Sequence, residues 1–184
     1  MWLTSAVAGA VVDNAEASRD KSQTMKLPSI ILSSMILIST ACTAVIPVQP
    51  VKVHGTAMLP ALGDGDRIVV ERNPQKLERG DIIVFLYPDD QTKSYIKRIV
   101  GLPHEVIEID EGKILVNGKP LDEPYVDPKL NLSGRGAAPL RLPADNYYVL
   151  GDNRDNSADS RLWGPVKKEL IYGRYLKKYF DAAP

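Results

Sequence analysis

Residues 106–118 have the sequence VIEIDEGKILVNG. Two short runs rich in apolar and β-branched residues, 106–109 and 113–116, flank an acidic-Gly turn at 110–112, and an Asn-Gly pair follows at 117–118. Pairs of this kind between β-type runs are typical of hairpin turns. The stretch therefore predicts consecutive antiparallel strands with tight connections.

The same pattern extends outward along the chain in both directions. Further strands are expected at residues 51–53, 67–72, 81–87, 94–100, 146–150 and 173–176. Local connections between short strands favour a mainly β fold, with an antiparallel sheet that coils into a partly open β-barrel. Residues 122–146, which are rich in Pro and Gly, are expected to form a long excursion from this sheet.

Composition excludes several classes of protein. The 184 residues carry 23 basic and 23 acidic side chains, and this balance gives no sign of a nucleic-acid partner. Cys42 is the only cysteine, so an internal disulfide is impossible. With His54 and His104 as the only histidines, the usual zinc sets are not available, and no metal or cofactor is expected.

The amino-terminal part is expected to reach a membrane. Residues 1–24 are mixed in character and predict a disordered leader. Residues 25–47 contain an uncharged run of 18 residues at 29–46, which is just long enough to cross a bilayer as a helix. Alternatively, Met25 begins a secretory signal that ends in a lipoprotein-type box, and Cys42 carries lipid. Residues 48–184 then form the folded domain.

Four segments of this domain resemble the signature boxes of type I (leader) signal peptidases, and they occur in that family's order. They are GTAMLPAL at 55–62, RGDIIVF at 79–85, YIKRIVGLP at 95–103 and GDNRDNSADSRLWGPV at 151–166. The last box has so many defined positions that a chance match is not credible. The resemblance implies a Ser/Lys-dyad serine endopeptidase at the outer face of the bacterial cytoplasmic membrane. Such an enzyme cleaves leader peptides from exported preproteins after small residues at the −1 and −3 positions.

By this resemblance Lys97 is the general base. A free lysine has a pKa of roughly 10.4, so the amine must be buried before it can act as a base at neutral pH. Tyr95, Lys97 and Ile99 are expected to share one face of a strand, which gives the lysine an apolar setting.

Ala57 occupies the position of the family's nucleophilic serine. A methyl group cannot attack a carbonyl, so the resemblance implies an impaired enzyme. The chain could be a natural inactive relative or a deliberate replacement, or a nearby hydroxyl could substitute. Thr56 is the nearest candidate but is expected to point to the opposite face, and Ser94 is expected to face away from Lys97. The Ala57 backbone N–H still fits an oxyanion hole, and Thr56 is a secondary candidate for that role.

The resemblance assigns the remaining site residues as well. Ser157 is expected to hydrogen-bond the amine of Lys97 and orient it, and Asp159 and Arg161 to support the site by a salt bridge. Leader peptides are expected to add as a strand along an open edge. Candidates for the lining of their pockets are Met58, Ile82, Val84, Tyr95 and Ile96. Candidates for contact with lipid headgroups are Trp163, Tyr172, Tyr175 and Tyr179, with Lys167, Lys168, Lys177 and Lys178.

Two further functions compete with a leader peptidase. One is a catalytically inactive envelope protein that binds signal-peptide-like segments. The other is a relative of the self-cleaving Ser/Lys repressors, which is disfavoured because the first fifty residues offer an apolar run instead of a helix-turn-helix. The sequence leaves the oligomeric state open.

Overall fold

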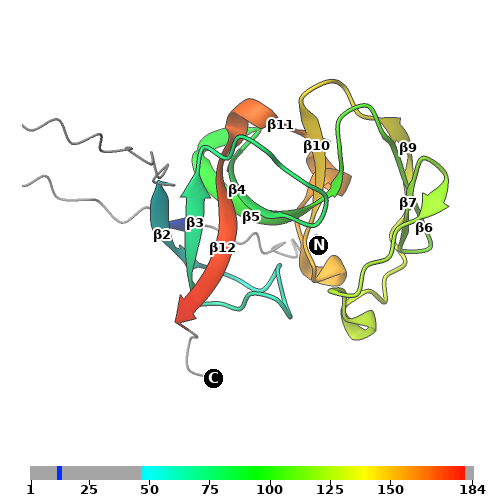
Figure 1. Cartoon of the computed structure of the whole chain (residues 1–184). Coiled ribbons are helices and arrows are strands. Elements are labelled where there is room, and N and C mark those ends of the chain that lie inside the picture. Colours follow the sequence, from blue (N-terminus) through cyan, green and yellow to red (C-terminus); the bar gives the residue numbers. More distant parts are fainter. Residues whose placement is uncertain (1–11, 14–46, 181–184) are drawn as a thin grey trace, which may run out of the picture.

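The computed structural model describes residues 12–13 and 47–180, and these residues form two antiparallel sheets (Figure 1). This confirms the mainly β prediction. The expected leader (apart from residues 12–13) and the expected anchor at 25–47 (apart from residue 47) lie outside the described residues. No helix within 12–13 and 47–180 is long and apolar enough to cross a membrane.

The larger sheet has the strand order β1-β2-β3-β12-β4-β5-β10-β11. Its strands are β1 (Val12–Asp13), β2 (Val48–Val53), β3 (Arg67–Arg72), β12 (Ile171–Phe180), β4 (Ile82–Tyr87), β5 (Asp90–Gly101), β10 (Asn146–Leu150) and β11 (Val166–Lys167). Short helical turns connect the final strands of the chain. They are η2 (Arg154–Asn156) and α1 (Ser160–Trp163) between β10 and β11, and η3 (Lys168–Leu170) between β11 and β12.

The smaller sheet contains the predicted hairpin segment at 106–118. Its order is β8-β7-β6-β9, formed by β8 (Lys119–Pro120), β7 (Lys113–Val116), β6 (Val106–Asp110) and β9 (Ala137–Arg141). The excursion at 122–146 contains the turn η1 (Pro128–Leu130) and the strand β9, which was not among the expected strands. Pro139 lies inside β9 and obscured it in the sequence, but a proline is tolerated because β9 is an edge strand.

The larger sheet buries side chains on both of its faces. One cluster contains Val53, Met58, Val84 and Ile96, and the other contains Ile83, Phe85, Ile99 and Val149. Neighbouring residues of β4 and β5 thus point into different clusters, as strand alternation requires. A third cluster joins the end of β5 and β10 to the smaller sheet.

The larger sheet coils without closing into a barrel. β10 pairs with β5 only from Arg98 to Gly101, which leaves the first half of β5 without a partner from β10. On the other side of this gap, β2 carries only the two-residue strand β1, which also contacts β5. Open strand edges on β2 and β5 therefore face a common gap, and β1 lies within it.

Gly101 marks the close approach of the two sheets. A Cβ at this position would lie 2.7 Å from Ile107 and 2.9 Å from Leu142, whose side chains are buried. We expect Gly101→Ala to destabilise the fold by about 1–3 kcal/mol through overpacking, measured by urea unfolding. Gly63→Ala is the matched control, because a Cβ at that position would lie 3.7 Å from its nearest neighbour, a side-chain atom of Leu59. Equal unfolding midpoints for the two variants would contradict this packing.

Candidate active site

Lys97 lies in the interior of the protein. It occupies the middle of β5 opposite Ile83 of β4, and its side chain is fully buried. The ring of Tyr95 lies on the same face of the strand, with its centroid 5.6 Å from the amine. The burial and the Tyr95 ring on the same face agree with the expectation from the sequence.

Burial controls the protonation of this amine. It lowers the pKa of Lys97 from 10.5 to about 8, since a charged ammonium loses its hydration inside the protein. The nearby carboxylates of Asp159 and Asp152 act in the opposite direction but do not overcome this loss. A substantial fraction of the amine is therefore neutral near pH 8 and able to accept a proton.

Both of these carboxylates are paired with arginines. Arg98 donates from Nε and Nη2 to the two oxygens of Asp152, at 2.8 and 2.6 Å. Arg161 donates to Asp159 from Nε and from Nη2, each at 2.8 Å, so the salt bridge expected from the sequence is present. These arginines balance the negative charge around Lys97, and Arg161 itself opposes protonation of the amine.

Ser157 does not make its expected hydrogen bond to Lys97. The amine donates instead to the carbonyl of Ile96, at 3.0 Å. The Ser157 Oγ is buried and has no hydrogen-bond partner within the described part of the chain. Its hydroxyl lies beside Gly151, because a Cβ built there would be only 2.3 Å from it. An orienting role for Ser157 thus requires a rearrangement of the amine.

The turn that carries Ala57 is bound by the loop at 151–161. Asn153 donates its backbone N–H to the carbonyl of Ala57 at 3.1 Å and its side-chain amide to the carbonyl of Thr56 at 3.2 Å. The Thr56 hydroxyl accepts a bond from Asn156 at 3.0 Å, so it is already engaged. The same loop thus contacts the turn at 57 and supplies the charges around Lys97.

Four of the five residues expected to line the substrate pockets lie together. Met58, Ile82, Val84 and Ile96 belong to one buried cluster, together with Val51 and Val53 of β2. Tyr95 lies on the other face of the sheet, where its ring contacts those of Tyr87 and Trp163. The cluster lies directly behind the edge of β2 that borders the gap.

Some residues around the site were not assigned from the sequence. They are Arg98 and Asp152, described above, and Glu123, which binds Arg154. Arg154 was not assigned either, and its side chain is almost completely buried. No local pattern reveals these pairs, because each joins residues far apart in the chain.

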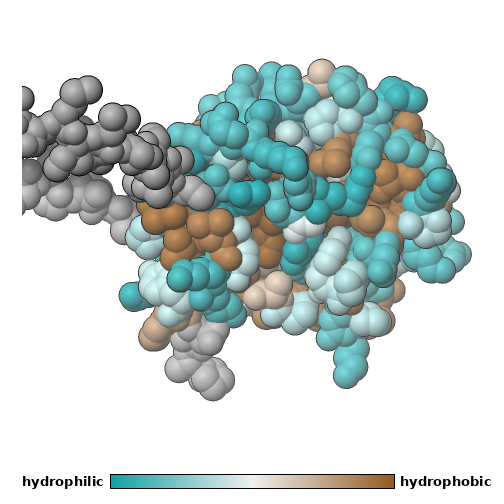
Figure 2. Space-filling model, viewed as in Figure 1, coloured by the Kyte–Doolittle hydropathy of each residue, from teal (hydrophilic) through white to brown (hydrophobic). Residues whose placement is uncertain are grey.

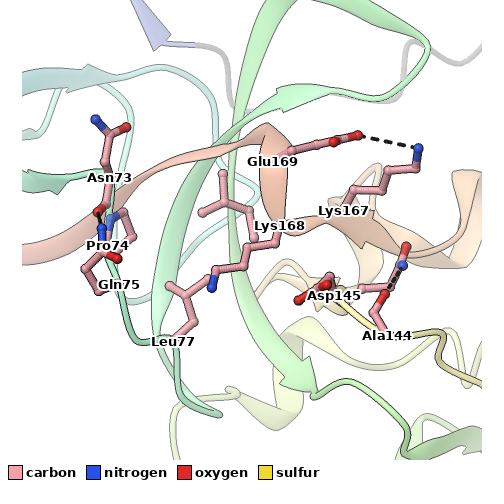
Figure 3. Close-up of a pocket in the computed structure, with 11 residues that line it drawn as sticks. Asn73, Pro74, Gln75, Leu77, Ala144, Asp145, Lys167, Lys168 and Glu169 are labelled. Carbon is pink, nitrogen blue, oxygen red and sulfur yellow. Dashed lines mark hydrogen bonds and ion pairs between the residues drawn. The ribbon is translucent and has the colours of Figure 1, made fainter.

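A separate cavity of about 670 Å³ is lined by none of the predicted catalytic or substrate-binding residues (Figure 3). It lies where the segment after β3 approaches η3 and the start of β10. Its lining consists of Asn73, Pro74, Gln75, Leu77, Ala144, Asp145, Asn146, Lys167, Lys168, Glu169 and Ile171. It is therefore distinct from the region around Lys97.

The fold and this buried lysine define a class of protein, which the family comparison identifies. The model of "Signal peptidase, peptidase S26" matches residues 25–180, so the chain belongs to that family. This confirms the resemblance found in the four sequence boxes.

Two relatives agree with this assignment in sequence. A signal peptidase I of Leptolyngbya laminosa is 39% identical over 137 residues, which cover 67% of this chain and 64% of the relative. Signal peptidase I P of Bacillus subtilis subsp. natto is 36% identical over 154 residues, covering 78% of this chain and 81% of the relative. A solved signal peptidase I from Enterococcus faecalis is 31% identical, with a TM-score of 0.44, and the match covers 54% of this chain and 97% of that one.

The buried amine gives a prediction for stability. The unfolded amine keeps its proton up to a pH near 10.5, whereas the folded one releases it near 8. The full free-energy cost of burying the charge therefore reduces stability below pH 8, and this cost falls to zero as the pH rises to 10.5. We expect Lys97→Met to stabilise the fold by about 1–3 kcal/mol at pH 7, with a gain that shrinks as the pH rises.

Urea unfolding between pH 7 and 10.5 measures this difference. Lys93→Met, an exposed change on the same strand, is the control and should alter stability little. A Lys97→Met variant that is less stable than the parent at pH 7, or whose gain does not vary with pH, would contradict the burial of a charge-bearing amine.

Proposed function

We propose that this chain is a signal peptidase of the Ser/Lys-dyad type whose nucleophile position is occupied by Ala57. Its reaction is the cleavage of leader peptides from exported preproteins at the outer face of the bacterial cytoplasmic membrane. The observation that carries the proposal is the buried amine of Lys97, with its pKa of about 8. The match covers only 64% of the Leptolyngbya laminosa relative and 61% of a probable signal peptidase I-2 of Synechocystis sp., so this activity is inferred from the site.

In the proposed mechanism a serine hydroxyl at position 57 attacks the scissile carbonyl. The neutral amine of Lys97 takes the hydroxyl proton and returns it to the leaving amine. The backbone N–H at 57 stabilises the oxyanion. Since Ala57 has no hydroxyl, only the base, the oxyanion donor and the binding surface are present in this chain.

Strand addition is the proposed mode of substrate binding. The edges of β2 and β5 face the same gap, and β1 already pairs there, with Val12 opposite Val53 and Asp13 opposite Lys52. An extended segment therefore fits this edge. Main-chain hydrogen bonds would provide affinity, and the apolar cluster around Met58 would select small side chains.

Ala57 itself favours a second candidate function. A chain that keeps the buried base and the open strand edges but lacks a nucleophile could bind signal-peptide-like segments without cleaving them. Binding and cleavage use the same surface in this scheme, so the two functions differ only in the chemistry at position 57.

Lipid contact is proposed for the end of β12. Leu176, Tyr179 and Phe180 are exposed there beside Lys177 and Lys178, and apolar surface is visible over β2, β3 and β12 (Figure 2). Aromatic rings and basic tips are favoured at lipid headgroups. Trp163, Tyr172 and Tyr175 pack partly against the core instead, so they are weaker candidates than the sequence suggested.

Restoring the nucleophile tests the proposal. We expect Ala57→Ser to raise kcat for cleavage of a preprotein by a factor on the order of a million, because loss of a serine nucleophile costs about that much in comparable hydrolases. Below pH 8 the rate should fall about tenfold per pH unit, as Lys97 becomes protonated.

Ala61→Ser is the matched control, because it adds a hydroxyl close to the same turn and should leave the chain inactive. Combining Ala57→Ser with Lys97→Met should abolish the gain. Cleavage by neither the parent chain nor Ala57→Ser, together with tight binding of leader peptides, would favour the binding protein. Equal cleavage by both would show that position 57 is not the nucleophile.

A further inference from the structure

Arg154 is an unusually buried cation in the loop at 151–161. Its side chain is 2% exposed, and its guanidinium donates to Glu123 Oε2 at 3.0 Å and to Oε1 at 2.5 Å. The third nitrogen of the guanidinium, Nε, donates to the carbonyl of Gly151 at 3.1 Å. A paired, two-pronged contact of this kind fixes both the position and the orientation of the arginine.

Glu123 reaches this loop from a different part of the chain. It lies between β8 and η1, outside the four signature boxes. Tyr125 donates its hydroxyl to Glu123 Oε1 at 2.8 Å, and the guanidinium carbon of Arg98 lies 4.1 Å from the centre of the Tyr125 ring. The segment at 123–125 therefore contacts two arginines, Arg154 and Arg98, that also bind residues of the loop at 151–161.

Two short routes lead from Arg154 to the surroundings of Lys97. In the first, Arg154 binds the carbonyl of Gly151, whose N–H donates to Asp159 at 3.1 Å. In the second, the carbonyl of Arg154 accepts a bond from Arg161 at 2.8 Å, and Arg161 is paired with Asp159. Asp159 is the nearby acid with the greatest effect on the Lys97 amine.

We propose that Glu123 is a positioning residue for the active site. Its carboxylate holds Arg154, and Arg154 fixes the loop that carries Ser157 and Asp159 and binds the carbonyl of Ala57 through Asn153. Loss of the carboxylate leaves a buried guanidinium uncompensated, so the loop must open to hydrate it. The role in cleavage rests on the proposed function, whereas the hold on the loop does not.

Glu71 provides a matched control. It also binds one arginine, Arg174, at 2.9 and 2.6 Å, and its side chain is 15% exposed against 11% for Glu123. This pair joins β3 to β12, and none of its described contacts reaches the loop at 151–161. Arg174 also lies 3.8 Å from Asp81 and is 29% exposed, against 2% for Arg154. Glu71→Gln therefore shows the effect of removing a paired glutamate remote from the loop.

The first experiment measures hydrogen exchange in the parent chain, in Glu123→Gln and in Glu71→Gln. We expect faster exchange at the amides of Gly151 and Asn153 in Glu123→Gln alone, while the amides of β5 stay protected. Unchanged exchange in the loop, or equal acceleration in both variants, would overturn the proposal.

The second experiment adds the same changes to Ala57→Ser and measures preprotein cleavage. Glu123→Gln should lower kcat by about 10–100-fold with little change in KM, because small displacements of reacting groups are that costly. Glu71→Gln should leave kcat unchanged. Removing Arg154 as well should cost little more, since the pair acts as a unit.

The outcomes separate the two proposals. If the Ala57→Ser chain cleaves and Glu123→Gln does not reduce its kcat, the positioning role is wrong while the proposed function stands. If Ala57→Ser never cleaves, the proposed function fails, and the exchange measurement alone decides whether Glu123 holds the loop.

Discussion

Burial of one lysine amine is the constraint on which the rest of this site depends. An ammonium deprived of water is destabilised unless a carboxylate compensates it, and in this protein the two carboxylates near Lys97 are themselves bound to Arg98 and Arg161. The charges around the amine are therefore largely balanced, and loss of hydration decides its protonation. A site of this kind produces a base near neutral pH without histidine, which is consistent with a chain that has only two histidines.

The coiled sheet supplies both the burial and the access that such a site needs. β5 lies between β4 and β10 in the larger sheet. β4 pairs with it along one edge, including Lys97, while β10 pairs only with the end of the strand. The open first half of β5 and the edge of β2 can accept an extended segment, as β1 shows by pairing at that edge. The incomplete barrel therefore buries the amine of Lys97 while leaving strand edges unpaired beside it.

Much of the fold, and the strand that carries Lys97, could be predicted from the sequence, because turns and strand alternation are local signals. The hairpin at 106–116 and the strand around Lys97 lie where those signals place them. β9 was missed because Pro139 conceals an edge strand. The contacts of Ser157 and Glu123 could not be derived from the sequence. The contact of Glu123 joins segments far apart in the chain, and the contact of Ser157 depends on which of several nearby acceptors the Lys97 amine binds.

Titration of Lys97 by NMR in the otherwise unchanged chain tests the central claim most directly. The ¹³Cε and ¹⁵Nζ shifts of this residue report its protonation, and Lys97→Met identifies the signal. The account predicts a midpoint near pH 8. A midpoint near 10.5, the ordinary value for a hydrated lysine, would show that the amine is not held in a dehydrated interior and would contradict its assignment as a base.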